Sequence, residues 1–246
     1  MELPSGLRSA LGTASKILVL TGAGMSAESG VPTFRDAQTG LWKNHRPEEL
    51  ATPQGFRAQP ELVWNWYQSR RDNIRAVLPH AGHYALVKIE RHFDEFLLVT
   101  QNVDSLHQKS GSVEVVELHG NIMRSICSET GRPIDDSWIQ STSERPPRSP
   151  HHPRGLARPD VVWFGEALPA GAMKRAMAAA LACDICFSIG TSTLVQPAAS
   201  LPFAALQSGA IVIEINPAPT GLATKVQFSL RATAAQALPV IAGALH

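Results

Sequence analysis

A glycine-rich turn after a short apolar run is the first feature of this sequence that could do chemistry. The run Ile17–Leu20 has the length of a buried strand, and Gly22-Ala23-Gly24 follows it, with Ser26 and Ala27 close behind. Glycines let the chain turn sharply and let backbone N–H groups approach a phosphate closely. The spacing Gly-x-Gly-x-x-Ala after a strand is typical of dinucleotide-binding sites. A plain tight turn explains the glycines alone nearly as well.

Polar residues also follow four other apolar runs that have the character of core strands. The runs are Phe96–Thr100, Val113–Leu118, Asp184–Ile189 and Ile211–Ile215. The polar clusters that follow them are Gln101–Asp104, His119, Gly190–Ser192 and Asn216. In open α/β sheets, ligands bind at the carboxyl ends of the strands. Five such clusters favour a large site for an extended ligand over ordinary loop polarity.

Helical patterns separate these runs and indicate the fold that must position the clusters. They cover residues 47–78, with breaks at Thr52-Pro53 and near Pro60, and residues 81–91, 170–182 and 197–208; a sixth strand is expected at Val226–Leu230. Strands that alternate with helices predict an α/β fold with a parallel, doubly wound (Rossmann-like) sheet.

Composition limits the partners and the compartment. The chain of 246 residues has 22 basic and 21 acidic side chains, a net charge of +1, so nucleic acid is not an expected partner. Three cysteines exclude a disulfide framework and fit a reducing compartment. No apolar stretch approaches the roughly 20 residues that cross a bilayer, and the first 15 residues do not resemble a signal peptide. We therefore expect a cytoplasmic protein that does not bind membranes.

Six motifs in a fixed order carry a family resemblance. They are GAGMSAESGVPTFRD, TQNVDSLH, ELHG, RPDVVWFGE, GTSTLVQPAA and INP. In this respect the chain resembles the sirtuins, which are NAD-dependent protein-lysine deacylases, from about Lys16 to Pro239. The resemblance implies that NAD is consumed as a co-substrate, that acyl-lysine proteins or peptides are the substrates, and that nicotinamide and O-acyl-ADP-ribose are the products. We expect a monomer.

The resemblance also implies a smaller domain inserted into the NAD-binding domain. We expect the NAD-binding domain to comprise residues 1–35, 81–120 and 159–246, and the inserted domain to comprise residues 36–80 and 121–158.

The resemblance assigns roles around the cofactor. The glycine-rich turns would hold the phosphates, Phe34 would cover the nicotinamide, Asp104 would recognise its carboxamide, and Ala234 would close over the adenine. The expected cofactor-binding residues are Gly22, Ala23, Gly24, Ser26, Phe34, Arg35, Trp42, Gln101, Asn102, Asp104, Gly190, Thr191, Ser192, Asn216, Pro217, Ala218 and Ala234.

His119 is the expected general base, with Asn102 and Arg35 as further catalytic residues. In the family this histidine removes a proton from the ribose diol after nicotinamide has left. Imidazole suits the role because its unperturbed pKa of about 6.5 leaves it largely neutral at cellular pH. Since the chain has nine histidines, a histidine that merely caps a strand end is the competing interpretation.

The helix around Glu61–Leu78 suggests which acyl group is bound. Val63, Tyr67, Arg70, Ile74 and Val77 recur at helical spacing and place Arg70 on a mostly apolar face. A buried guanidinium needs an anion, which would be either an acidic side chain of the protein or a carboxylate of the substrate. Alternatively, the aliphatic stem of Arg70 lies over the core while its guanidinium reaches water.

The resemblance favours a substrate carboxylate, rather than an internal salt bridge, as the anion that meets Arg70. Sirtuins that prefer succinyl-, malonyl- or glutaryl-lysine carry Tyr-x-x-Arg with a small alanine upstream, here Tyr67, Arg70 and Ala51. Acetyl-lysine remains an expected substrate as well. The segment Val162, Trp163, Phe164, Gly165 and Glu166 would pair with the substrate backbone as an added strand.

The chain departs from the family at the structural zinc site, which usually has two Cys-x-x-Cys pairs. Cys127 stands at the first ligand position, Thr130 replaces the second, and the second pair falls near Pro150 and Pro153. Cys183 and Cys186 have the right spacing, but they flank the start of a strand and read as small buried thiols. Cys127 with His151 and His152 would make a poor site. We expect no zinc.

Two further expectations follow from this departure. Without a zinc ion to hold it, the Pro/Ser/Arg-rich segment Ser141–Arg158 should be mobile or disordered. The alternatives to a deacylase are an NAD- or ADP-ribose-binding sensor whose catalysis lapsed with the zinc, and a mono-ADP-ribosyltransferase. The presence of His119, Asn102 and Asp104 argues against the sensor.

Overall fold

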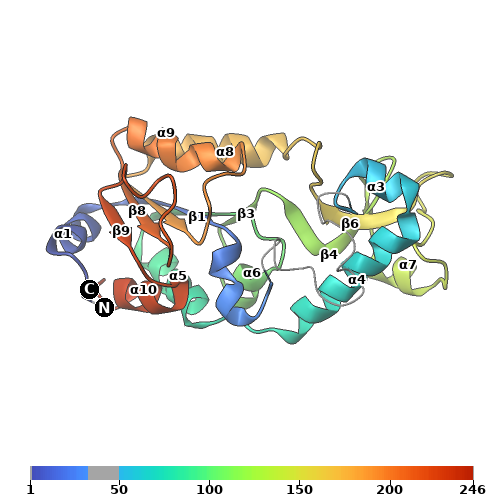
Figure 1. The fold of residues 1–246 in the computed structure, drawn as a ribbon, viewed down its shortest axis with the longest axis horizontal. Coiled ribbons are helices and arrows are strands. Elements are labelled where there is room, and N and C mark those ends of the chain that lie inside the picture. The colour runs from blue at the N-terminus through green and yellow to red at the C-terminus, as the bar shows by residue number, and fades with distance from the viewer. Residues whose placement is uncertain (1, 33–49, 246) are drawn as a thin grey trace.

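The computed structural model describes residues 2–32 and 50–245 as a molecule with two lobes (Figure 1). The larger lobe is built on a six-stranded parallel sheet in the order β3-β2-β1-β7-β8-β9. These strands are β1 (Lys16–Thr21), β2 (Glu95–Thr100), β3 (Val115–Glu117), β7 (Ile185–Ile189), β8 (Ile211–Ile215) and β9 (Phe228–Leu230). The predicted α/β fold and the six predicted strands are confirmed.

Helices cover both faces of this sheet (Figure 1). On one face lie α1 (Ser5–Thr13), α5 (Ala81–His92) and α10 (Ala234–Ala242), and on the other lie α8 (Ala170–Ala182) and α9 (Leu201–Gln207). Side chains alternate along each strand: Ile17 and Val19 pack toward the first group, while Leu18 and Leu20 pack toward the second. Because both faces are covered, the strands are apolar runs without polar alternation.

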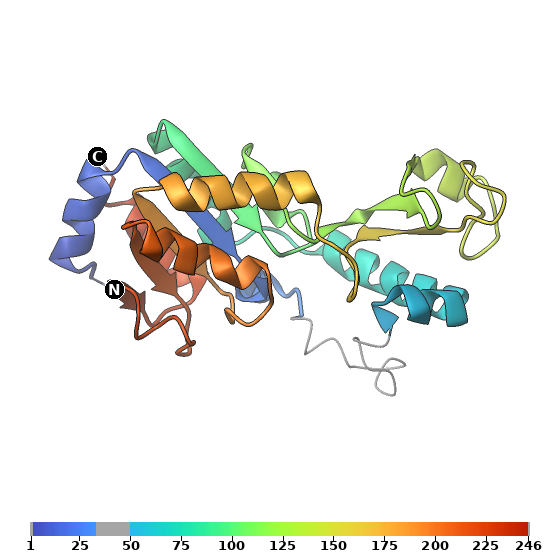
Figure 2. The ribbon, with the colours of Figure 1, turned by 90° about the horizontal axis from the view of Figure 1, so that it is seen from above.

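The smaller lobe contains an antiparallel sheet in the order β5-β4-β6, formed by β4 (Gly120–Cys127), β5 (Pro133–Ile134) and β6 (Ala157–Val161). Three helices pack around it: α3 (Pro53–Ala58), α4 (Pro60–Ala76) and α7 (Asp136–Gln140) (Figure 2). The breaks predicted in this helical region are confirmed, since Thr52 caps α3 and Pro60 begins α4. The remaining short elements are α6 (Leu106–Ser110) and the 3-10 turns η1 (Ala23–Met25), η2 (Ala27–Ser29) and η4 (Ala198–Ser200).

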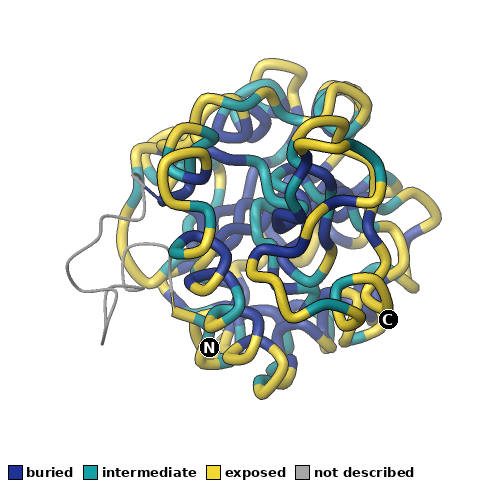
Figure 3. Tube along the Cα trace, turned by 90° about the vertical axis from the view of Figure 1, so that its right-hand side faces the viewer, coloured by how far each residue is buried: buried dark blue, intermediate teal, exposed yellow. Residues whose placement is uncertain are grey.

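The second lobe has its own core, in which Val63, Tyr67 and Ile74 of α4 pack with Ile122 and Trp163. In Figure 3 the buried segments lie inside the trace and the exposed ones form its outline. None of the helices in residues 2–32 and 50–245 is long and apolar enough to cross a membrane.

The structure corrects the prediction that Ser141–Arg158 lacks order. Pro146 and Pro147 are buried, the amide of Ser149 donates to the carbonyl of Gly155 over 2.8 Å, and the indole of Trp138 donates to the carbonyl of Arg148 over 2.8 Å. The segment therefore folds back on β6 and α7, because prolines and backbone hydrogen bonds replace the missing apolar side chains.

Candidate functional site

A cavity of about 980 Å³ lies between the two lobes, at the carboxyl edge of the six-stranded sheet. Residues that follow β1, β2, β3, β7 and β8 all line it, so the predicted convergence of the polar clusters is confirmed. The predicted site residues on its wall are Gly22, Ala23, Gly24, Ser26, Ala51, Tyr67, Arg70, Gln101, Asn102, Asp104, His119, Val162, Trp163, Phe164, Gly165, Glu166, Gly190, Thr191, Ser192, Asn216 and Ala218.

Glycines form the floor of the cavity by direct contact of two backbone turns. A Cβ on Gly24 would lie 2.8 Å from the Cα of Gly190, and one on Gly190 would lie 2.4 Å from the amide nitrogen of Met25. Gly190 also has φ +59°, a conformation that favours glycine. Gly24 donates its amide proton to the carbonyl of Gly190 over 2.8 Å. Side chains at these positions would force the two turns apart and so disturb a backbone arrangement of the kind that binds phosphate groups.

Side chains tie the loops around the cavity to one another. Asn102 donates through Nδ2 to the carbonyl of Gly22 (3.0 Å) and to Oγ of Ser26 (3.1 Å). Gln101 donates to the hydroxyl of Thr191 over 3.1 Å, and Asn216 donates to the carbonyl of Thr191 over 3.1 Å. The site is therefore one hydrogen-bonded frame drawn from four separate strand ends.

His119 is partly buried and has a defined tautomer. Its Nδ1 lies 2.9 Å from the backbone carbonyl oxygen of Gln101. Because a carbonyl oxygen only accepts, Nδ1 carries the proton and Nε2 keeps its lone pair in the neutral ring. Burial lowers the pKa of His119 below its ordinary value, although the hydrogen bond to Gln101 acts in the opposite direction. Burial thus favours the neutral ring, which lines the cavity with its Nδ1 proton bound to Gln101.

Asp104 is buried on the same side, with 3% of its surface exposed. Burial raises the pKa of its carboxyl group, while hydrogen bonds from the amide of Leu106 and the hydroxyl of Ser26 act against that shift. A carboxyl group held in this way can recognise an amide of a ligand by hydrogen bonding.

Tyr67 and Arg70 lie one turn apart on α4, and both line the cavity with Ala51. The Tyr67 hydroxyl accepts a proton from the indole nitrogen of Trp163 over 2.9 Å, so its own proton is available to donate. Burial raises the pKa of Tyr67 to about 12 and lowers that of Arg70.

No described acidic side chain meets Arg70. Its guanidinium lies over the ring of Trp66, 5.3 Å from the centroid, and no ion pair joins it to a carboxylate in the described part of the chain. The alternative of an internal salt bridge therefore finds no partner among these residues.

The segment Val162–Glu166 lies along the cavity but already uses several of its polar groups. Val162 donates its amide proton to the carbonyl of His119 over 2.9 Å, and Phe164 donates to the carbonyl of Ala51 over 2.9 Å. The Glu166 carboxylate is paired with Arg158 (2.6 and 2.9 Å), whose guanidinium lies 3.4 Å from the centroid of Trp163. Glu166 thus holds this segment in place, while Phe164 is 49% exposed.

Five predicted residues are not on the described cavity wall. Pro217 does not line it, and Ala234 is 3% exposed in the core beside α5, where its carbonyl contacts Gly82. Ala234 is buried because it begins α10, which packs on α5. Phe34, Arg35 and Trp42 lie outside the described residues. Conversely, Leu194, Val195 and Thr220 line the cavity without having been predicted. Leu194 and Val195 belong to the motif GTSTLVQPAA, and their apolar character in a polar loop was the available signal.

The region of the family's zinc site is occupied by other groups. The residues that gather around Cys127 are Ser149 and His152, each one position before the prolines that the sequence indicated. A Cβ on Gly155 would lie 2.7 Å from Sγ of Cys127, 3.1 Å from Cβ of Ser149 and 3.2 Å from Cβ of His152. Thr130 completes the set, because hydrogen bonds from the side chains of Ser149 and Thr130 reach the sulfur. Burial alone would raise the pKa of Cys127, but these bonds hold it below its usual value.

This donor set does not fit a zinc ion. Only one of its four members is a thiol, and the two hydroxyls are not the ligands that structural zinc prefers. Nε2 of the neighbouring His151 lies 2.7 Å from the carbonyl of Pro133, and Nδ1 of His152 accepts from the amide of Arg154 over 3.2 Å. Within residues 2–32 and 50–245, no three His, Cys, Asp or Glu side chains gather as metal ligands would.

Comparisons with known proteins show the family to which the chain is similar. The family model described as "Sir2 family" matches residues 22–197. An NAD-dependent protein deacylase of Thermus thermophilus is 45% identical in an alignment 250 positions long, gaps included, which covers 98% of this chain and 94% of that protein.

Solved structures are also similar. A complex of a Sir2 homologue with NAD superposes with a TM-score of 0.90 at 39% identity, and covers 99% of this chain and 94% of that one. A complex of Sir2 with a p53 peptide and NAD⁺ has a TM-score of 0.86 at 26% identity, with 98% and 97% coverage.

Proposed function

The chain belongs to the Sir2 family and is an NAD-dependent protein deacylase, and we propose that its acyl pocket prefers acyl groups that end in a carboxylate. Succinyl-, malonyl- and glutaryl-lysine are such substrates, and acetyl-lysine would be a weaker one. The observation that carries the proposal is the pair Tyr67 and Arg70, which faces the cavity beside the small Ala51 and meets no carboxylate among the described residues. A guanidinium and a phenolic hydroxyl together suit a carboxylate.

NAD would supply the ribose carbon to which the acyl oxygen bonds, with nicotinamide as the leaving group. The residues present suit the cofactor, because Gly24 and Gly190 bring two backbone turns into direct contact on the wall of a large cavity, with no side chain between them. In our proposal, Ala23, Thr191 and Ser192 complete the phosphate site, Asn216 and Ala218 bind the adenosine side, and Asp104 recognises the nicotinamide amide. We also propose that Phe34, Arg35 and Trp42 bind the cofactor and that Arg35 takes part in catalysis, as the sequence leads us to expect.

His119 would act as the general base through Nε2. Its Nδ1 proton is held by the carbonyl of Gln101, so the free lone pair is at Nε2, on a ring that lines the cavity. Burial lowers the pKa of His119 and so favours the neutral ring, which a base that removes a ribose hydroxyl proton requires. Asn102, fixed by Gly22 and Ser26, would orient the ribose.

The substrate would be an acyl-lysine segment of a protein or peptide. Val162–Glu166, with its exposed Phe164, would border that segment from one side. We further propose that the inserted lobe comprises residues 36–80 and 121–158, that the chain works as a monomer, and that it acts in the cytoplasm without nucleic acid or membrane partners. The three cysteines are free, as a reducing compartment requires.

An acyl panel tests the proposal. Matched peptides carrying acetyl-, succinyl-, malonyl- and glutaryl-lysine would be incubated with NAD, and kcat/KM would be measured by nicotinamide release. We expect the acidic acyl groups to be removed faster than acetyl. Faster removal of acetyl than of every acidic group would refute the preference. NAD binding without turnover of any peptide would favour the sensor, and protein labelling by NAD without an acyl peptide would favour ADP-ribosyl transfer.

A further inference from the structure

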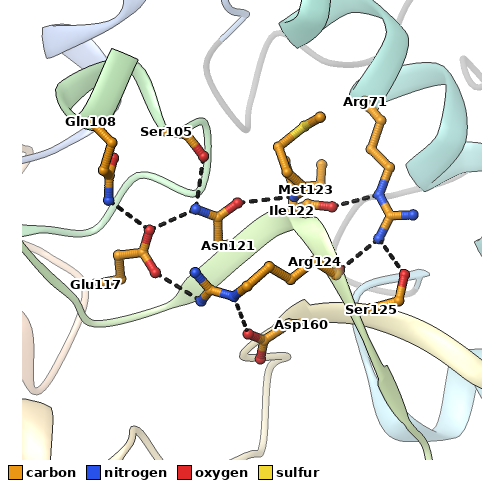
Figure 4. Close-up of polar contacts among 10 residues, drawn as sticks. All are labelled: Arg71, Ser105, Gln108, Glu117, Asn121, Ile122, Met123, Arg124, Ser125 and Asp160. Carbon is orange, nitrogen blue, oxygen red and sulfur yellow. Dashed lines mark hydrogen bonds and ion pairs between the residues drawn. The ribbon is translucent and has the colours of Figure 1, made fainter. Parts of the chain in front are cut away.

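The turn that carries His119 is closed by a hydrogen bond between the side chains on either side of it (Figure 4). Nδ2 of Asn121 donates to Oε1 of Glu117 over 2.6 Å, so the residue two positions after His119 binds the residue two positions before it. Neither Asn121 nor Glu117 lines the cavity. We propose that Glu117 and Asn121 are positioning residues that hold His119 for proton transfer, an inference that rests on the proposed role of His119 as the base.

Asn121 is committed to this task by burial and by its other contacts. It is 5% exposed, and its amide nitrogen also donates to Oγ of Ser105 over 2.7 Å. Its Oδ1 accepts from the amide of Met123 over 3.0 Å. The polar atoms of its side chain are therefore all engaged, and an apolar replacement would leave the partly buried carboxylate of Glu117 and the partly buried hydroxyl of Ser105 each without one donor.

The hydrogen bond from Asn121 to Ser105 also reaches the loop that contains Gln101, the hydrogen-bond partner of His119. Ser105 ends the loop that starts at Gln101, and it has φ +62°, a strained value for a residue other than glycine. The carbonyl of Gln101 in this loop holds Nδ1 of His119. Asn121 thus ties the turn that carries the ring to the loop that fixes its tautomer.

Glu117 anchors the other end of the turn. Its Oε1 also accepts from Gln108 of α6 (2.8 Å), and its Oε2 accepts from Arg124 of β4 (2.8 Å). Arg124 in turn donates to Asp160 of β6 over 2.8 Å. Figure 4 shows these contacts as one network that spans both lobes. Gly120 beside His119 has φ +76°, and a Cβ there would lie 2.2 Å from the carbonyl oxygen of Asp160, so the turn packs against β6 too closely to admit a side chain at this position.

The two stages of the reaction separate positioning of the base from general damage. In the proposed reaction, the bond between the ribose carbon and nicotinamide would break in the first stage, as the acyl oxygen bonds to that carbon. Free nicotinamide would reverse this stage, so labelled nicotinamide would exchange into NAD. His119 would remove the ribose hydroxyl proton only after this stage. A misplaced base should therefore lower deacylation and spare exchange.

The test measures both rates for Asn121→Ala with an acyl peptide that the wild type turns over. We expect kcat for deacylation to fall about 10- to 100-fold, as misplacement of a catalytic group by about 1 Å can do, and exchange to change by less than about threefold. Asp160→Ala is the matched control, because it removes the other carboxylate bound to Arg124 and leaves the Glu117–Asn121 bond. Since such half-exposed ion pairs contribute little, both of its rates should stay within about twofold.

Equal losses of exchange and deacylation in Asn121→Ala would overturn the proposal and make Asn121 a purely structural residue. Should Asn121→Ala not fold, Glu117→Gln and Glu117→Ala take its place. The glutamine keeps a carbonyl oxygen for Asn121 and should keep the wild-type ratio of the two rates, whereas the alanine should lower it; equal ratios in both would refute the proposal. His119→Ala tests the premise separately, because full deacylation in that variant would refute the role of the base itself.

Discussion

Arg70→Met should change which acyl group the enzyme prefers. The substitution keeps an unbranched stem on α4 and removes the guanidinium that lines the cavity beside Tyr67. That guanidinium lies over Trp66, 5.3 Å from the ring centroid, and burial already lowers its pKa. It therefore bears a desolvation cost that no described carboxylate offsets, and a substrate carboxylate would offset it.

The expected size of the effect follows from this environment. Two unit charges 4 Å apart attract by about 4 kcal/mol at an effective dielectric constant of about 20. Desolvation of the substrate carboxylate reduces the net gain to the range of charged hydrogen bonds, about 1.5 to 3 kcal/mol. Since about 1.4 kcal/mol is a factor of ten, kcat/KM for succinyl-lysine should fall about 10- to 150-fold. An acetyl group has no charge to lose, so its kcat/KM should change by about threefold at most.

The assay compares succinyl- and acetyl-lysine forms of one peptide in the wild type, in Arg70→Met and in Arg75→Met. Arg75 is the matched control, because it lies on the same helix but is exposed and paired with Asp72 over 2.8 Å. We expect Arg75→Met to resemble the wild type on both peptides. Equal losses on the two peptides in Arg70→Met would refute the carboxylate site and make Arg70 a structural residue.

Three further predictions concern stability, the cofactor site and metal. Burial lowers the pKa of His83 to about 2 and that of His107 to about 3, so the unfolded chain binds more protons below pH 6.5. Each histidine should then remove about 1.4 kcal/mol of stability per pH unit as the pH falls from about 6.5 toward 3, and urea unfolding that is independent of pH in this range would contradict it. Gly190→Ala should abolish NAD binding in calorimetry, because its Cβ would meet Met25, whereas Gly209→Ala, with φ +89° and open space, should keep it. Metal analysis should find no stoichiometric zinc, and a chelator should leave Tm unchanged. One bound equivalent of zinc would contradict the conclusion that the groups around Cys127 do not form a zinc site.

The sheet and the convergence of the site could be predicted because both follow from simple rules. Apolar runs such as Ile17–Leu20 are buried on both faces, so they have strand length and no polar alternation. Parallel strands end at one edge, so the order of runs and polar clusters along the chain was enough to place Gln101, His119 and Thr191 together. The roles of single residues were predicted from the resemblance to the family. The structure adds details that the resemblance could not supply, such as the tautomer of His119.

Helix α4 shows where periodicity falls short. The pattern predicted one stripe through Val63, Tyr67 and Arg70, but Trp64 and Arg71 are buried as well. Arg71 is 3% exposed and donates to the carbonyls of Ile122 (2.5 Å) and Arg124 (2.7 Å) and to Ser125 (3.0 Å). A charged side chain that backbone carbonyls satisfy leaves no signal in a hydrophobic pattern, because its partners are far away in the sequence.

The segment Ser141–Arg158 was mispredicted for a related reason. Low apolar content normally prevents a chain from offsetting its lost conformational entropy. Here Ser149 pairs with Gly155, and Ala157 donates to the carbonyl of Pro147 over 2.7 Å, so backbone bonds to the neighbouring strand order the segment. Composition cannot report such contacts.

The most direct test of the account is the product balance of one reaction. The protein would be incubated with NAD and a succinyl-lysine peptide, and nicotinamide, O-succinyl-ADP-ribose and free lysine peptide would be quantified by mass spectrometry. We predict equal amounts of the three products, and with His119→Ala we predict neither O-succinyl-ADP-ribose nor free lysine peptide above background. Nicotinamide released without O-succinyl-ADP-ribose, or deacylated peptide formed without NAD, would contradict an NAD-consuming deacylase at this site.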